Sequence, residues 1–271
     1  MSQIPLGQHS PYETQYNPKL LFPILRQKNR DALSIKPTKL PFHGVDVWHA
    51  YEMSWLNNKG KPQNAIGRFT IPCDSPNLIE SKSFKLYLNS LNGTRFDNWE
   101  KVDETLQRDL SECAGKSVGV EIFTIDSFMG EFYRQVGGHC IDDLDIEINE
   151  YQVNPKLLST KAQTVNEKLY CNLLKSNCLV TGQPDWGSLQ IEYRGPQIDH
   201  ENLLKYLISY RDHQEFHEQC VERIFTDILN HCKPVELTLV ACYTRRGGLD
   251  INPVRSTDPN VRYDLSRCPR Q

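Results

Sequence analysis

The stretch Ser188-Leu-Gln-Ile-Glu-Tyr-Arg194 alternates apolar and polar side chains at every second residue. A period of two is typical of a strand with one buried face, because successive side chains point to opposite faces of a sheet. Residues 168–175 are predicted to form its partner strand. Gly182, Pro184 and Gly187 lie between the two and favour a turn. The stretch therefore predicts a pair of strands joined by a loop.

Downstream of this pair, the chain continues with a helical segment and a further strand. Residues 200–232 carry apolar side chains at helical spacing, which predicts one long helix. Residues 235–243 alternate again, with Leu237, Leu239 and Ala241 on one face. The second half of the chain thus has the order strand, strand, helix, strand.

The first half shows the same order. Two strands, a helix and a final strand are predicted, in that order, over residues 45–55, 63–71, 97–115 and 117–125. Periodicity alone does not assign residues 80–91 to a helix or a strand. Two such units in succession indicate a duplicated α+β fold, in which the repetition lies in the order of elements and not in the letters.

The chain is divided accordingly. Residues 1–40 are rich in proline, glutamine and asparagine, which predicts an irregular N-terminal arm. A first unit is predicted over residues 41–150 and a second over residues 151–271. The polar segment 150–166 is the expected linker between them.

Composition narrows the class of protein. The 271 residues are 38% apolar and 24% charged, as in an ordinary globular protein, and the net charge is −3. Such a charge gives no basic field for a polyanion, so no direct contact with nucleic acid is expected. No run of 18 apolar residues exists, and the first residues lack the pattern of a signal peptide. We therefore expect no membrane span, a cytoplasmic location, and thiols rather than disulfides at the nine cysteines.

Cys178 and Asp185 lie seven residues apart across the loop that joins the strand pair. A thiolate is a strong nucleophile toward an electron-poor carbon, and a carboxyl group can deliver the proton that the product needs. The same spacing also suits a buried structural cysteine followed by a capping or surface aspartate. The residues alone leave both interpretations open.

Three further clusters could carry chemistry. They are Glu80-Ser-Lys-Ser-Phe-Lys85, Phe216-His217-Glu218 in the middle of the predicted long helix, and Tyr243-Thr-Arg-Arg-Gly-Gly248. Arginines beside glycine backbone suit a phosphate, because the guanidinium fork matches phosphate oxygens and glycine permits close approach. The plainer alternatives are a solvated acid at a helix start, a structural histidine and an exposed basic turn.

One further group of residues has the types that bind a metal. His213, His217 and Cys220 have ligand spacing on a helix, but Val221 stands where a His-Glu-x-x-His motif needs histidine. We expect no metal.

Four segments together resemble one family, and the resemblance runs from about residue 40 to residue 256. The segments are Ile79-Glu-Ser-Lys-Ser-Phe-Lys-Leu-Tyr-Leu-Asn89, residues 178–187, Glu215-Phe-His-Glu-Gln-Cys220 and Arg245-Arg-Gly-Gly-Leu-Asp-Ile-Asn252. They are similar to motifs of the long, two-domain nitrile reductases of the queuosine pathway of tRNA modification. These enzymes reduce 7-cyano-7-deazaguanine (preQ0) with NADPH. The resemblance implies two tandem tunnelling-fold units, antiparallel sheets with helices on one face, and a homodimer.

The resemblance also implies roles for individual residues. Cys178 matches the nucleophile that forms a covalent thioimide, and Asp185 matches the proton donor. The positions that match substrate-binding residues are Ile79, Glu80, Ser81, His217 and Glu218. Those that match NADPH-binding residues are Ser81, Lys82, Arg246 and Gly247. Two alternatives remain, a zinc-dependent tunnelling-fold cyclohydrolase acting on a pterin or purine nucleotide, and a base-binding module without catalysis.

Overall fold

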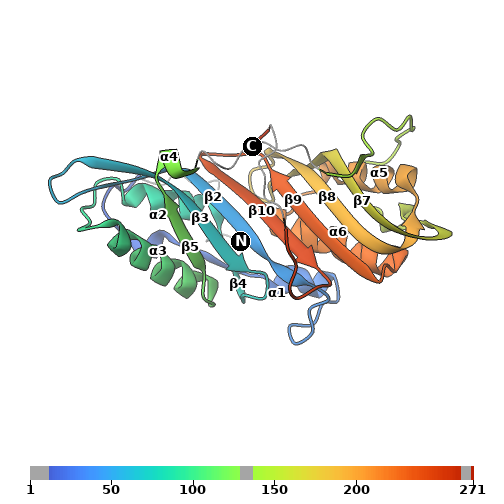
Figure 1. Cartoon of the computed structure of the whole chain (residues 1–271), viewed down its shortest axis with the longest axis horizontal. Coiled ribbons are helices and arrows are strands. Elements are labelled where there is room, and N and C mark those ends of the chain that lie inside the picture. The colour runs from blue at the N-terminus through green and yellow to red at the C-terminus, as the bar shows by residue number, and fades with distance from the viewer. Residues whose placement is uncertain (1–11, 129–136, 264–269) are drawn as a thin grey trace. The chain divides into compact units, whose positions relative to one another are not determined.

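A computed structural model describes residues 12–128, 137–263 and 270–271 of the chain (Figure 1). The chain forms two compact units, each built from three stretches. The first unit comprises Met1–Lys28, Asp46–Glu131 and Arg245–Asp250, and the second comprises Asn29–Val45, Phe132–Thr244 and Ile251–Gln271. Compactness alone does not define domains, so the domain limits expected from the sequence, at residues 40 and 150, stay predictions.

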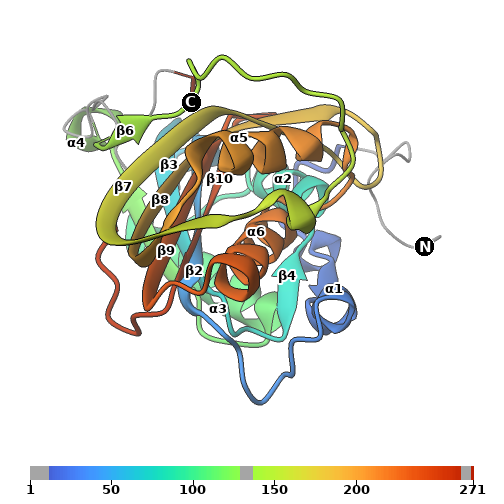
Figure 2. The ribbon, with the colours of Figure 1, turned by 90° about the vertical axis from the view of Figure 1, so that its right-hand side faces the viewer.

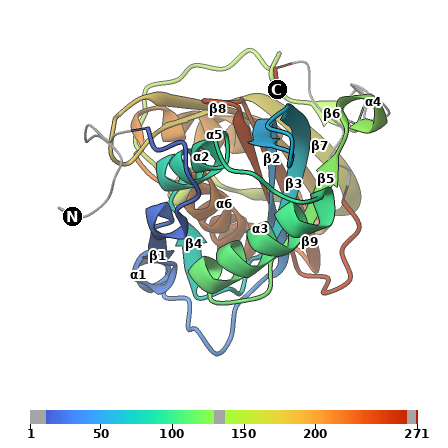
Figure 3. The ribbon, with the colours of Figure 1, turned by 90° about the vertical axis from the view of Figure 1, so that its left-hand side faces the viewer.

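The first unit packs two helices on one face of its strands (Figure 3). Its strands lie in the order β5 (Gly119–Phe123), β3 (Pro62–Pro72), β2 (His43–Leu56), and a small second sheet pairs β1 (Pro23–Leu25) with β4 (Asn77–Ile79). The helices are α2 (Ser81–Ser90) and α3 (Trp99–Ala114), with the short α4 at Ile125–Phe128. Phe84 of α2 lies in the core against Trp48 and Phe69. Aromatic side chains thus join helix to sheet.

The second unit has the same plan with longer strands (Figure 2). Its strands lie in the order β10 (Leu249–Ser256), β9 (Glu236–Tyr243), β8 (Pro184–Ile198), β7 (Thr160–Asn177), β6 (His139–Cys140). Only β6 in this series runs parallel to its neighbour. Helices α5 (His200–Ile208) and α6 (His217–Cys232) cover one face of the sheet. In the described residues, no helix is both long and apolar enough to cross a membrane.

Most strands predicted from alternation are confirmed, and so is the helix over residues 97–115, which is α3. Residues 80–91, left unassigned, form α2. Strand β10 was not foreseen because all of its side chains are buried, so it shows no alternation. The described part of the predicted N-terminal arm contains three short elements, η1 (Pro18–Leu20), β1 and α1 (Gln27–Ala32). Its residues 1–11 lie outside the described ranges.

The prediction of one long helix over residues 200–232 is wrong. Helix α5 ends at Ile208, a 3-10 turn η3 covers Ser209–Asp212, and α6 begins only at His217. Between them the chain is extended, and Gln214 forms an isolated parallel bridge with Asn177. This distant backbone pairing interrupts a helical pattern that the side chains alone would continue. His217 therefore lies at a helix N-terminus and not in mid-helix.

The expected linker over residues 150–166 is also wrong in part, because β7 already begins at Thr160. The first residues of β7 are exposed and polar, so they lack the alternation that marks a half-buried strand. They pair with the far end of β8, with a register shift between Thr160 and Thr164. Backbone pairing, and not burial, makes this part of the strand.

The duplication extends to the letters, contrary to our expectation. Glu13-Thr-Gln-Tyr-Asn-Pro-Lys-Leu-Leu21 and Glu150-Tyr-Gln-Val-Asn-Pro-Lys-Leu-Leu158 share seven identical positions of nine. Both segments make the same contacts. Asn17 donates from its backbone to Ser90 Oγ (3.2 Å), and Asn154 donates likewise to Ser209 Oγ (3.3 Å). The two units therefore share sequence, local structure and tertiary contacts.

Candidate active site

Cys178 begins the loop between β7 and β8. Its backbone N–H donates to Gln183 O at 2.8 Å, and its own carbonyl accepts from Gly182 N at 3.0 Å. Gly182 has φ = +67°, a left-handed conformation that glycine adopts without cost. The side chain of Cys178 is a thiol with only 7% exposure. The glycine and proline of the predicted loop thus close it as expected and set the thiol at its first position.

Asp185 and His217 come together in the second unit. The strand register pairs Asp185 with Ser176, two residues before Cys178. His217 Nε2 lies 3.6 Å from Asp185 Oδ1, which is longer than a hydrogen bond but within ion-pair range. The Asp185 side chain is 3% exposed, so little water screens this contact. The pair can share or pass a proton over a short distance.

Tyr243, on β9, supports this pair. Its ring meets the His217 ring edge-on, with centroids 4.0 Å apart. Tyr243 pairs in the sheet with Gly187, and a Cβ on Gly187 would lie 3.3 Å from the tyrosine ring. The bare glycine therefore leaves room for Tyr243 to lie across β8 beneath His217. The sequence named Tyr243 only as the start of a basic cluster and Gly187 only as a turn residue, because their contact depends on strand register.

Glu218 follows His217 in the first turn of α6 and is 4% exposed. A carboxylate at a helix N-terminus is favoured by the backbone N–H groups there. His217 and Glu218 of the predicted cluster thus lie at the start of α6, where a ligand can approach. Neither is a surface residue in the middle of a helix.

The metal pattern considered in the sequence is corrected by the structure. Ligand atoms of His213, Glu215 and Cys220 lie within 4.8 Å of one another, while His217 is engaged with Asp185 instead. The Glu215 carboxylate is already bound by Arg223 through two hydrogen bonds. An arginine fork on the carboxylate opposes a second cation there, so the donor set does not suit a divalent metal.

In the first unit, Glu80 forms the N-cap of α2. Its carboxylate accepts from Lys82 N (2.9 Å) and Ser83 N (2.7 Å), and it is 1% exposed. Burial raises the pKa of Glu80, although these hydrogen bonds oppose the shift. The backbone of Glu80 is held as well, because its N–H donates to Phe22 O in the N-terminal segment. Two carboxylate lone pairs remain for a ligand.

The neighbours of Glu80 share this arrangement. Ile79 ends β4, where it is buried and pairs with Pro23 of β1, and Ser81 opens α2. These three consecutive residues are therefore fixed by a strand pair on one side and a helix cap on the other. Such fixation from both sides suits a ligand-binding position.

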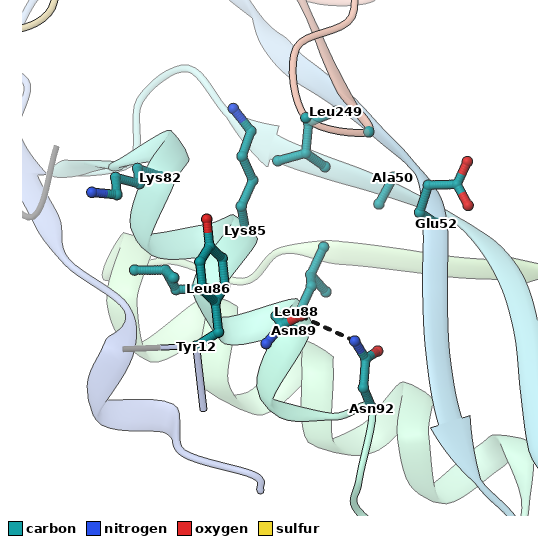
Figure 4. Close-up of a pocket in the computed structure, with 12 residues that line it drawn as sticks. Tyr12, Ala50, Glu52, Lys82, Lys85, Leu86, Leu88, Asn89, Asn92 and Leu249 are labelled. Carbon is teal, nitrogen blue, oxygen red and sulfur yellow. Dashed lines mark hydrogen bonds between the residues drawn. The ribbon is translucent and has the colours of Figure 1, made fainter. Parts of the chain in front are cut away.

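A pocket of about 370 Å³ lies beside α2 (Figure 4). Two lysines of α2, Lys82 and Lys85, line it together with the Gly247–Gly248 turn before β10. Arg246 and Leu249 close this turn through backbone hydrogen bonds, and both glycines have positive φ. Lys85 and Tyr12 also line the pocket; Lys85 belongs to the Glu80–Lys85 cluster named from sequence but was given no role there, and Tyr12 was not singled out. The lysine could have been found from its i, i+3 spacing with Lys82.

Two family models match the chain. One, described as nitrile reductase, 7-cyano-7-deazaguanine-reductase N-term, matches residues 12–122, and one described as QueF-like protein matches residues 184–261. Together they take in every candidate residue except Cys178, which lies between them.

The chain is also similar to curated proteins over nearly its whole length. A protein of Hydrogenovibrio crunogenus named NADPH-dependent 7-cyano-7-deazaguanine reductase is 57% identical, covering 98% of this chain and 96% of the relative. A protein of the same name from Chromobacterium violaceum is 55% identical with the same coverage. A solved structure of an archaeosine synthase QueF-Like is 19% identical over 38% of this chain and 99% of its own, and its TM-score of 0.31 is too low to bear on the fold.

Proposed function

Since the chain belongs to the family of NADPH-dependent 7-cyano-7-deazaguanine reductases, we propose that it reduces preQ0 to 7-aminomethyl-7-deazaguanine (preQ1) with NADPH, a step of queuosine biosynthesis. Family membership confirms the predicted class of two tandem tunnelling-fold units. It also makes the chain an oxidoreductase, which removes the cyclohydrolase and the non-catalytic module from consideration.

The chemistry at the nitrile begins with Cys178. Its thiolate adds to the nitrile carbon, the electron pair of one C–N π bond moves to nitrogen, and Asp185 transfers its proton to that nitrogen. The product is a covalent thioimide. A nitrile is a poor hydride acceptor, whereas a protonated thioimide carries positive charge at carbon, so the covalent step divides one difficult reduction into easier ones.

The two reductions then occur at the same carbon. NADPH held by Ser81, Lys82, Arg246 and Gly247 would supply the hydride for each reduction, the first at the thioimide carbon and the second, from another NADPH, at the imine left when the C–S bond breaks and its electron pair returns to sulfur. His217 is placed to return a proton to Asp185 between these steps, because the two groups are 3.6 Å apart.

Carboxylates would orient the deazapurine. The substrate presents N–H donors along its base edge, and carboxylate oxygens are acceptors only. Glu218 and Glu80 are both buried carboxylates at helix N-termini, and we assign them to this edge together with Ile79, Ser81 and His217. A base without those donors would leave the carboxylates unpaired, so it should be rejected.

The residues of the first unit fit the phosphate groups of NADPH. Lys82 and Lys85 supply positive charge at one pocket, and the Gly247–Gly248 turn lets backbone approach an oxygen closely. Arg246, which begins that turn, adds a fork suited to phosphate, and Ser81 lies one residue before Lys82. These groups would bind and orient the cofactor and take no part in bond making.

The observation that carries the proposal is the contact between His217, at the start of α6, and the buried Asp185, on the hairpin whose loop begins at Cys178. A test is to mix the protein with preQ0 and follow both adduct formation by mass spectrometry and NADPH oxidation by absorbance. We expect Cys178→Ala to bind preQ0 and to show neither adduct nor NADPH oxidation. Appreciable turnover by Cys178→Ala would reject the assignment of the nucleophile.

The cofactor residues need a separate test. For Arg246→Ala we expect a higher KM for NADPH while the adduct with preQ0 forms at the wild-type rate. An unchanged KM would contradict the role of Arg246. The homodimer, implied by the family resemblance, and the cytoplasmic location, expected from the sequence pattern, stay predictions.

A further inference from the structure

The extended segment over residues 213–216 contacts the Cys178 loop on one side and leads into α6 on the other. Asn177, the residue before Cys178, donates to His213 O at 2.8 Å and accepts from Glu215 N at 3.2 Å. His217 follows this segment directly. The segment therefore connects the residue before Cys178 to His217 through two backbone hydrogen bonds.

Glu215 fixes the segment by its side chain as well. Its carboxylate, 5% exposed, accepts from Arg223 Nε (3.0 Å) and an Arg223 terminal nitrogen (2.8 Å), and it lies 2.9 Å from His213 Nε2. Arg223 lies on α6, so this ion pair joins the segment to the helix it precedes. Burial would raise the pKa of Glu215, but the hydrogen bonds from His213 and Arg223 hold it below its ordinary value. The carboxylate is thus charged at neutral pH.

A two-pronged, buried ion pair restricts orientation more than a single contact does, because both planar groups must align. Such a pair is weak evidence for overall stability, since desolvation offsets much of the attraction. Its value here lies in geometry. The nucleophile must approach its target within about 3–3.5 Å, and a misplacement of about 1 Å costs on the order of 100-fold in rate.

We propose that Glu215 is a positioning residue for the reaction, which through Arg223 and the Asn177 backbone sets Cys178 relative to His217 and Asp185. This inference rests on the proposed function. We assign Glu215 no contact with the substrate or the cofactor. It acts by holding the segment over residues 213–216 between the Cys178 loop and α6.

The test compares Glu215→Gln with a matched control. Glutamine keeps the shape of the side chain but turns N–H groups toward Arg223, so the fork is lost. Glu222→Gln is the control, because Glu222 lies on α6 and forms buried ion pairs with Arg30 (2.6 Å) and Arg255 (2.8 Å), neither of which belongs to the segment over residues 213–216. Arg223→Lys, which keeps the charge and loses the fork, tests rescue by a conservative change.

Three quantities are measured for each variant: the thermal midpoint, the dissociation constant for preQ0, and the rate of adduct formation without NADPH. We expect both glutamine variants to lower the thermal midpoint. Only Glu215→Gln should slow adduct formation, by about 10- to 100-fold, with little change in the dissociation constant. Arg223→Lys should lie between Glu215→Gln and the wild type.

Each outcome bears on one claim. Equal adduct rates in the wild type and Glu215→Gln would overturn the positioning role. Equal slowing by Glu222→Gln would also overturn it, since the effect would then follow from lost stability. A wild-type protein that forms no adduct would instead refute the proposed function.

Discussion

The loops of the long hairpins in the two units are closed by the same backbone hydrogen bonds but carry different side chains. In the first unit, Asn57 N donates to Lys61 O (3.0 Å) and Gly60 N donates to Asn57 O (2.9 Å). In the second, Cys178 N donates to Gln183 O and Gly182 N to Cys178 O. Each loop is followed by a proline that opens the next strand. Cys178 therefore occupies the position of Asn57.

The strand before each loop is held by an equivalent bridge. Leu56 exchanges backbone hydrogen bonds with Thr94 and Phe96, just as Asn177 does with His213 and Glu215. Both units therefore share the backbone scaffold that holds this loop. The loop of residues 178–183 is one residue longer than that of residues 57–61.

What differs is the side chains set on this shared scaffold. Asn57 Oδ1 accepts from Lys59 N and Lys61 N and so tightens its own turn. Cys178 instead gives its loop a thiol, which we propose as the nucleophile. Asn98 caps α3 by accepting from Lys101 N, whereas Phe216 at the start of α6 has no side-chain oxygen to do so. The second unit gives up local stabilising groups where the first keeps them, which is common at functional sites.

The largest effect is expected from removing the acidic proton of Asp185. This residue occupies the position that Gln63 has in the first hairpin. Asp185→Asn keeps the size of the side chain and removes its acid. We expect adduct formation to slow by about 10²- to 10⁴-fold, the usual contribution of a general acid. Rapid-quench mass spectrometry with preQ0 measures this rate.

The matched control lies in the other hairpin. Gln63→Ala changes the aligned position, whose amide only binds the nearby carbonyls of Lys61 and Pro62, and should leave the rate unaltered. If Asp185→Asn formed adduct as fast as Gln63→Ala, the acid of Asp185 would not distinguish the second hairpin from the first.

A smaller effect is expected at Gly187, where the first hairpin has an alanine at the aligned position. Gly187 aligns with Ala65, and an added Cβ at 3.3 Å from the Tyr243 ring would push that ring by a few tenths of an ångström. Because His217 packs on this ring, Gly187→Ala should slow adduct formation roughly tenfold. Thermal unfolding measured in parallel separates this shift from a loss of fold. An unchanged rate would mean that Tyr243 does not set the position of His217.

Sequence reasoning found the strands, the α+β class and the loop between Cys178 and Asp185, because alternation and turn residues are local signals. It missed the interruption before His217, because Gln214 is held in an extended conformation by Asn177, a residue far away in the chain. It also missed the contacts of Glu215 with Arg223 and of Tyr243 with His217, which depend on register and packing. The repeated Asn-Pro-Lys-Leu-Leu segments were visible in the letters, and a comparison of the chain with itself would have found them.

The smallest effect is expected from removing the Tyr243 hydroxyl. This change separates the contribution of the hydroxyl from that of the ring that packs on His217. The hydroxyl is buried, and among the described residues it makes no hydrogen bond of good geometry, although the Ser176 side chain lies near enough to oppose the rise of its pKa. Burial raises the pKa of this phenol well above its ordinary value, so it stays protonated throughout the working pH range. Removing a buried polar group that lacks a partner is nearly neutral or stabilising.

We therefore expect Tyr243→Phe to change the free energy of unfolding by less than about 1 kcal/mol and to keep the adduct rate near that of the wild type. Tyr243→Ala is the contrasting variant, because it removes the ring under His217 and leaves a cavity that costs about 3–5 kcal/mol. Chemical denaturation and rapid-quench assays measure both. A large loss of rate in Tyr243→Phe with stability intact would show that the hydroxyl moves a proton, and the ring would then be more than a support for His217.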